Sequence, residues 1–256
     1  MKKPFSRGLR RLPYGLVILY EDRDLLVVDK PPGLLTVATV HEKSRTVHSI
    51  LTEYFRAGCG KSRKRLFIVH RLDRDTSGVL LFAKSEEAMY RLKANWPRTE
   101  KKYLAVVHGV CEPSGTITSH LAEDADYFVF STSEDGQGRL ARTDYRLLKV
   151  KRGLSLLEVT LLTGRKNQIR VHMTEIGHPI VGDTKYGKKD DLAPRLALHA
   201  RSISFPHPFS GKRLTFEAPA PEFFKKLVGP LEGPEGAEGR PGCQQSALDT
   251  NGGSSD

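Results

Sequence analysis

A charged loop between two apolar runs holds the residues best suited to chemistry. Residues 66–70 and 79–84 have the apolar composition of strands, and Asp73 lies in the loop between them. Its neighbours Arg71 and Arg74 are both basic. We expect a nearby cation to keep the carboxylate ionised and to lower its pKa, and an ionised, positioned carboxylate can act as a nucleophile or a base. A solvated turn with a local ion pair fits the same residues equally well.

A second stretch, residues 161–173, contains the end of a strand, a glycine turn and the start of a basic helix. Arg165 and Lys166, together with the backbone N–H groups at the helix start, would form an anion site. Arg170 lies off the apolar stripe that begins at Ile169, so we expect its side chain to face away from the core. An exposed basic helix without a ligand is the alternative.

A third stretch, residues 100–109, places Tyr103 at the start of a strand beside two lysines. An aromatic ring next to cations can stack on a nucleobase. A tyrosine in such a strand is more often part of the core, so this stretch also leaves a purely structural alternative open.

Taken together and in this order, the three stretches resemble the RluA-type pseudouridine synthases, which isomerise uridine in RNA. The run from His70 to Gly78 is similar to the signature of that family. The other similar blocks are residues 25–35 (with Asp29-Lys30-Pro31-Pro32-Gly33), 102–109, 163–173 with 177–187, 198–200 and 216–219. The resemblance covers about residues 16–225.

The resemblance implies a role for each matching residue. Asp73 would be the catalytic aspartate, and Arg71 would take the place of the base in the RNA stack when the target uridine flips out. Tyr103 would stack against the flipped base, and Arg170 would pair with Asp73 and keep it charged. The residues expected to contact RNA phosphates are Arg74, Arg165, Lys166 and Asn167. The reaction needs no cofactor and no metal.

One departure from the family pattern is Lys166-Asn167, since family members often carry Thr-His or Ser-His there. Both residues can still meet a phosphate or a hydroxyl group. A catalytically inactive RNA-binding module of the same fold is the main alternative. The presence of Asp73, Tyr103 and Arg170 favours an enzyme.

The elements that must position these residues are mostly strands. We expect strands at residues 16–20, 25–29, 66–70, 79–84, 103–108, 115–120, 143–150 and 154–162. We expect helices at residues 46–57, at 85–96 with Ser85 as N-cap, at 167–176 ended by Gly177, and at 221–228. Many strands with few helices between them favour an α+β fold. This agrees with the implied pseudouridine synthase fold, a mixed, mostly antiparallel sheet in two halves with a catalytic cleft across it.

The charge balance favours a polyanionic partner. The formal charge is +11, and the segment from residue 230 onward carries a net −4, so residues 1–229 carry +15. RNA, either ribosomal or transfer RNA, suits such a surplus. We expect a basic flexible arm at residues 1–11, a catalytic domain at 12–229 and a disordered acidic, Gly/Ser-rich tail at 230–256.

Other classes of protein are disfavoured. The three cysteines are far apart and form no C-x-x-C pair, which argues against a zinc site and suits a reducing cytoplasm. No apolar stretch approaches the ~20 residues of a membrane span. Gly60-Lys61-Ser62 ends like a P-loop, but Phe55 stands where the first glycine should be. No H-x-x-x-H pair supports a metal hydrolase. We expect a monomer.

Overall fold

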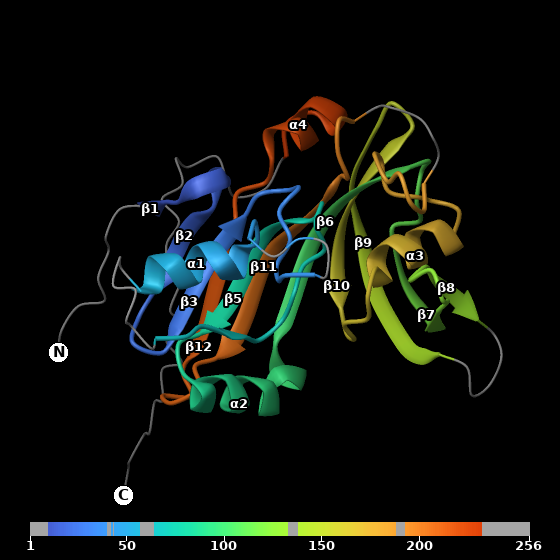
Figure 1. Cartoon of the computed structure of the whole chain (residues 1–256). Coiled ribbons are helices and arrows are strands. Elements are labelled where there is room, and N and C mark those ends of the chain that lie inside the picture. Colours follow the sequence, from blue (N-terminus) through green and yellow to red (C-terminus); the bar gives the residue numbers. More distant parts are fainter. Residues whose placement is uncertain are drawn as a thin grey trace, which may run out of the picture.

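The computed structural model describes residues 10–39, 42, 44–56, 64–132, 138–187 and 193–231. Within them, one mixed sheet runs through the molecule, with a helix on each part of it (Figure 1). The strands are β1 (Arg10–Arg11), β2 (Val17–Glu21), β3 (Leu25–Lys30), β4 (Phe67–Ile68), β5 (Ser77–Ala83), β6 (Glu100–His108), β7 (Ser114–Glu123), β8 (Val129–Thr132), β9 (Arg139–Lys151), β10 (Leu154–Leu161), β11 (Leu198–Pro206) and β12 (Arg213–Glu217). The helices are α1 (Val47–Arg56), α2 (Glu86–Ala94), α3 (Gln168–Glu175) and α4 (Glu222–Val228), with short 3-10 turns η1 (Pro13–Gly15) and η2 (Trp96–Arg98).

The sheet has the order β1-β2-β3-β5-β11-β6-β10-β9-β7-β8, with β12 beside β11 and β4 beside β5. The first half of the chain builds one side of this sheet and the middle of the chain builds the other. Strand β11 joins them, since it pairs parallel with β5 and antiparallel with β6. Its pairing with β5 is the single parallel pair among the strands that the structure describes, so the expected mixed, mostly antiparallel α+β sheet is confirmed.

The junction of β5 and β11 depends on Gly78. This residue has φ +112°, and a Cβ built on it would lie 2.2 Å from the carbonyl oxygen of Ala200. Only glycine allows the two backbones to approach so closely in that conformation. The glycine that closes the signature loop therefore also allows the two halves of the sheet to join.

Both faces of the first half are covered. Alternate residues of β3 and β5 point to opposite faces, so Leu26 and Leu80 join the core under α1 whereas Leu25 and Leu81 join a second core under α2. Helix α3 packs Ile169 and Met173 on the same core as α1. The two helices lie over the same face of the sheet, one on each half (Figure 1). Among the described residues, no helix is long and apolar enough to cross a membrane.

The four expected helices are confirmed within the described residues, although Ala57 lies outside them. Ser85 caps α2 by accepting a hydrogen bond from the Ala88 backbone N–H at 3.1 Å. Gly177 follows α3 with φ +80°, as expected for a C-terminal cap. The eight expected strands are present, with β4 shorter than expected. Four further strands were not expected, namely β1, β8, β11 and β12.

The expected arm and tail are only partly visible. Arg10 and Arg11, the last two residues of the arm, pair with β2, so this end of it is not a free arm. At the other end, the Pro230 carbonyl accepts a hydrogen bond from Lys149 Nζ at 2.7 Å, and Leu231 packs against the core. The rest of both segments lies outside the described residues, as does Gly60-Lys61-Ser62.

Candidate active site

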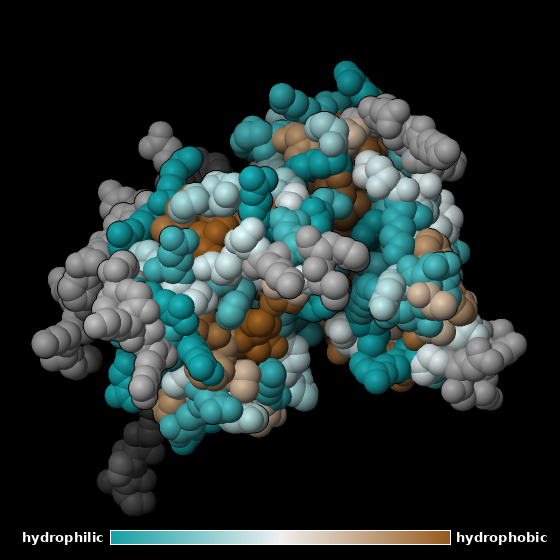
Figure 2. Space-filling view, in the orientation of Figure 1, coloured by the Kyte–Doolittle hydropathy of each residue, from teal (hydrophilic) through white to brown (hydrophobic). Residues whose placement is uncertain are grey.

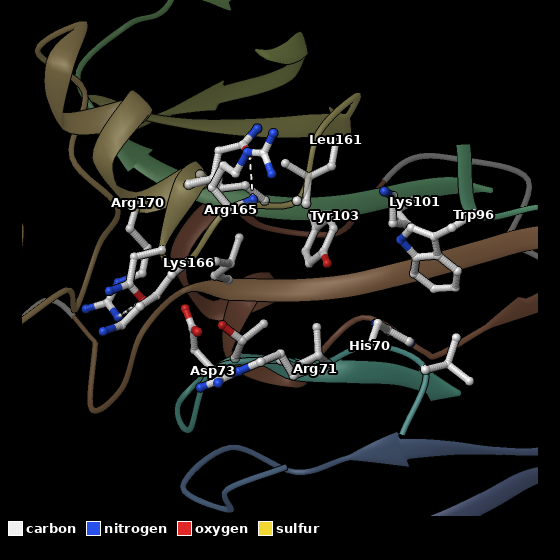
Figure 3. Close-up of a pocket in the computed structure, with 18 residues that line it drawn as sticks. His70, Arg71, Asp73, Trp96, Lys101, Tyr103, Leu161, Arg165, Lys166 and Arg170 are labelled. Carbon is white, nitrogen blue, oxygen red and sulfur yellow. Dashed lines mark hydrogen bonds between the residues drawn. The ribbon is translucent and has the colours of Figure 1, made fainter. Parts of the chain in front are cut away.

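A pocket of about 320 Å³ opens between the two halves of the sheet. Figure 2 shows this face hollowed between the halves, with hydrophilic side chains along the hollow. All three chemically unusual stretches of the sequence contribute to it (Figure 3). The expected site residues that line the pocket are Arg71, Asp73, Tyr103, Arg165, Lys166, Asn167 and Arg170. Arg74 does not line it, because its guanidinium is exposed and pairs with Glu42 at 3.1 Å.

The loop that carries Asp73 is held on both sides. Before it, Thr36 Oγ1 donates to the Leu72 carbonyl at 2.7 Å and accepts from the Leu72 N–H at 3.1 Å. After it, the fully buried Lys30 donates from Nζ to the Arg74 carbonyl at 2.8 Å. Lys30 also donates to the Leu34 carbonyl at 2.7 Å, which ties the loop to the chain segment after β3. The backbone around Asp73 is therefore fixed by groups from an earlier part of the chain.

Burial dominates the electrostatics of Asp73. It raises the pKa of the carboxyl group above its ordinary value, although the positive charges of Arg170, Arg71, Lys30 and Lys166 act in the opposite direction. The expectation of a lowered pKa was therefore wrong, because desolvation of the charged form outweighs the neighbouring cations. A desolvated carboxylate is a stronger base and a stronger nucleophile than a hydrated one.

Arg170 has a different ion-pair partner from the one expected. Its Nε donates to Asp183 Oδ2 at 2.8 Å and its NH2 to Asp183 Oδ1 at 2.7 Å. This two-pronged geometry matches a guanidinium to a carboxylate. The backbone N–H groups of Lys185 and Tyr186 also donate to Asp183, which fixes its position. Arg170 still exerts the strongest positive influence on Asp73, through space instead of through a direct ion pair.

Arg170 is also buried, contrary to the expectation that it faces away from the core. Helix α3 is buried at each position from Gln168 to Met173, because its second face packs against Leu121 and Val129 of β7 and β8. The exposed basic helix considered as an alternative is thereby excluded. The charge of Asp183 balances that of the Arg170 guanidinium and so allows it to be buried.

Tyr103 lies in the pocket wall opposite Asp73 (Figure 3). It is 8% exposed, and burial together with the charge of Asp73 raises the pKa of its hydroxyl. The ring comes from β6, which places Lys101 and Tyr103 on one face and Lys102 on the other. Tyr103 and Asp73 thus enclose a space that a planar ring can enter from the cleft.

The basic residues around this space differ in how firmly they are held. Lys166 pairs with Glu123, and Arg165 donates from Nε to the Leu140 carbonyl at 3.0 Å. Asn167 donates to the Tyr186 hydroxyl at 3.0 Å. Arg71, by contrast, is exposed and makes no hydrogen bond or ion pair with another residue in the described part of the chain. Compared with Arg165 and Lys166, the side chain of Arg71 is therefore the one most free to move and contact a bound ligand.

Two residues that the sequence did not single out also line the pocket, Trp96 and Lys101. Their signals were present, since Trp96 is the one tryptophan of the chain and Lys101 stands two positions before Tyr103. Asp183 was also missed, although it lies in a block that carries the family resemblance. Among the described residues, no group of three or more His, Cys, Asp or Glu side chains could hold a metal ion.

The chain is similar to known RNA pseudouridine synthases in sequence. A family model described as RNA pseudouridylate synthase matches residues 24–175. An uncharacterised RNA pseudouridine synthase of Bacillus subtilis, YlyB, is 38% identical over 84% of this chain and 73% of its own length. The ribosomal large subunit pseudouridine synthase C of Buchnera aphidicola is 37% identical over 84% of this chain and 70% of its own length.

A solved structure extends the likeness to the fold. The human RNA pseudouridylate synthase domain containing 1 superposes with a TM-score of 0.65 and 26% identity, covering 89% of each chain. The matched family segment holds Asp73, Tyr103 and Arg170. The chain therefore belongs to the RNA pseudouridine synthases of the RluA type and is an isomerase.

Proposed function

We propose that the chain converts specific uridines to pseudouridine in structured RNA, with Asp73 as the catalytic residue. The observation that carries this is the position of Asp73, a partly buried carboxylate on a loop held by hydrogen bonds on both sides, which faces Tyr103 across a pocket. The isomerisation breaks the bond between ribose C1′ and uracil N1 and forms one between C1′ and C5. The proton of C5 leaves and N1 gains one, so no redox partner is needed.

The side chains that line the pocket have different roles in the proposed reaction. The ionised Asp73 serves as the nucleophile or base that starts the exchange of bonds. The ring of Tyr103 holds the uracil while it turns, and the ion pair of Arg170 with Asp183 keeps a positive charge near Asp73 without neutralising it directly.

Arg71 suits the role of a wedge in the RNA stack. Extruding a base costs a few kcal/mol of stacking and pairing, and a planar cation inserted in its place recovers part of this. An exposed arginine without a partner can enter the stack without breaking an interaction within the described part of the protein. Arg165 and Lys166 at the opposite rim are positioned for the RNA backbone.

Ribosomal RNA is the substrate class that we favour over transfer RNA. The relatives of Buchnera aphidicola and Zymomonas mobilis, at 37% and 36% identity, are described as ribosomal large subunit pseudouridine synthases C and D. The low cysteine count supports action in a reducing compartment such as the cytoplasm. Pseudouridine maps of ribosomal RNA from cells with and without this gene test the assignment.

The role of Asp73 is tested with Asp73→Asn, which keeps the shape of the side chain and removes the carboxylate. We expect loss of tritium release from C5-labelled RNA with RNA binding retained. Substantial tritium release by Asp73→Asn would overturn the assignment. RNA binding without tritium release by the unaltered protein would instead favour the inactive binding module.

A further inference from the structure

The pocket continues past Tyr103 to a second group of side chains that the proposed reaction does not use. Trp96, in η2, and Lys101, on β6, line this end of it. In Figure 3 they lie on the far side of Tyr103 from Asp73. Lys101 and Tyr103 are neighbours on one face of β6, about 6.7 Å apart along the strand. The extension is therefore continuous with the place proposed for the flipped uridine.

Lys101 is a cation without an anion. Its side chain is partly buried, and this burial lowers the pKa of its ammonium group. Among the described residues, no carboxylate lies within ion-pairing distance of it, and its ammonium lies 5.6 Å from the centroid of the Trp96 ring. The adjacent Lys102, on the other face of β6, has both Glu100 and Glu158 nearby. Lys101 is thus left with an unmet preference for a negative charge.

Trp96 is partly exposed, and its indole ring packs against a neutral side chain, His70. The imidazole of His70 packs 5.1 Å from it, and burial lowers the pKa of His70 to about 3. His70 Nε2 accepts a hydrogen bond from the Leu81 N–H at 3.1 Å, which fixes the ring in its neutral form. Because His70 is neutral, the positive charge beside the Trp96 ring comes from Lys101, and His70 helps to hold that ring in place.

An aromatic surface beside a cation that lacks an anion is suited to a nucleotide, with its flat base and charged phosphate. We infer that Trp96 and Lys101 form a second nucleotide subsite, which takes the RNA residue next to the target uridine. Its base packs on the exposed part of the indole and its phosphate meets the ammonium of Lys101. This subsite rests on the proposed function for the identity of the neighbouring nucleotide, and its contacts add affinity whatever base stands beside the target, because stacking and phosphate contacts are tolerant of sequence.

The fluorescence of Trp96 reports on this subsite directly, because the chain holds one tryptophan. The probe is an RNA stem-loop with a uridine in its loop, titrated into the full-length protein while filter retention measures binding in parallel. We expect saturable quenching with the same dissociation constant in both measurements. RNA that is retained on the filter without a change in tryptophan emission would overturn the inference.

Substitutions separate the base contact from the phosphate contact. Trp96→Ala should weaken RNA binding about 5- to 150-fold, with the loss mainly in KM, and Trp96→Phe should restore most of it. Lys101→Ala should lower the slope of log K against log salt by about one, whereas the exposed Lys226→Ala should leave it unchanged. An unaltered affinity and salt slope in Lys101→Ala would count against the subsite even if Trp96→Ala fails to fold.

The two proposals fail in different ways. Quenching of Trp96 by RNA in a protein that forms no pseudouridine would refute the proposed reaction and support the subsite. Pseudouridine formation with unchanged Trp96 emission would support the reaction and refute the subsite.

Discussion

At the scale of single residues, two aspartates in and beside the pocket are held in opposite ways. Asp183 accepts both prongs of Arg170 and two backbone N–H groups, and these hydrogen bonds lower the pKa of its carboxyl group despite its burial. Asp73 has no such partners within the described part of the chain, and burial raises its pKa. The protein thus stabilises the charge of Asp183, which holds Arg170 in place, and leaves desolvated the charge of Asp73, which we propose performs the chemistry.

This contrast predicts stability effects of opposite sign. The raised pKa of Asp73 means that its contribution to stability is present below the unfolded-state pKa and is lost as the pH rises through the folded-state pKa. At neutral pH the ionised Asp73 is therefore destabilising, and Asp73→Asn should melt at a higher temperature than the unaltered protein. Thermal melts well below the unfolded-state pKa of ~3.9, near pH ~2.5, where the carboxyl group of Asp73 is neutral in both the folded and the unfolded chain, should show the difference vanish.

Asp183→Asn is the matched control, since its lowered pKa gives a contribution that is present at neutral pH and is lost on acidification. It should lose about 3–5 kcal/mol at neutral pH, because Arg170 is left buried and unpaired. If Asp73→Asn instead melted at a lower temperature than the unaltered protein at neutral pH, the inference that desolvation makes the ionised Asp73 destabilising would be refuted.

The identity of most site residues could be read from the sequence, but their environments could not. Asp73, Tyr103 and Arg170 meet in one pocket as the family resemblance implied. The partner of Arg170 was mistaken, because Asp183 is brought to it by a turn that local patterns do not reveal. The position of the loop that carries Asp73 depends on Thr36 and Lys30, which precede it by more than thirty residues.

At the scale of elements, the helices were easier to predict than the strands at the sheet's centre and edges. The helices α1 to α4 can be identified from the caps and apolar stripes within their own sequences. Strand β8 has four residues and β12 has five, too few for a clear alternation. Strand β11 carries His199 and Arg201 within it, and its place between β5 and β6 is decided by tertiary packing.

The contact between β5 and β11 predicts an unusual sensitivity at Gly78. Gly78→Ala places a Cβ against the Ala200 carbonyl at 2.2 Å and should reduce the free energy of unfolding by about 4 kcal/mol or more, with loss of activity. Gly153 is the control, since it has φ +72° with no atom near its Cβ position. Gly153→Ala should lose only the ~1–2 kcal/mol of a left-handed conformation. Equal losses in urea unfolding would contradict the close approach of the strands.

At the scale of the whole molecule, a strongly basic body is combined with a cleft in which two of the five lining cations have carboxylate partners among the described residues. Lys166 and Arg170 have carboxylate partners, so much of the net +15 of residues 1–229 lies outside the pocket. We therefore expect the basic surface outside the pocket to attract RNA over long distances, and the few side chains that line the pocket to recognise the uridine.

This distribution predicts strongly salt-dependent binding. RNA affinity should fall by about 10³-fold or more between low and physiological salt, as expected when several phosphates are neutralised. Asp73→Asn should show the same slope of log K against log salt, because that residue meets no phosphate in the proposed site. A nearly flat dependence would mean that surface charge does not drive binding.

The central place of β11 has a consequence for how the protein is made. The strand that closes the pocket begins at Leu198, whereas the residues proposed for chemistry are all synthesised by Arg170. During translation, the two walls of the cleft therefore leave the ribosome well before the strand that fixes their separation. An emerging chain that already carries the aspartate, the tyrosine and the arginine has no finished pocket. Completion of the proposed site is thus delayed until β11 has been synthesised and has paired with β5 and β6.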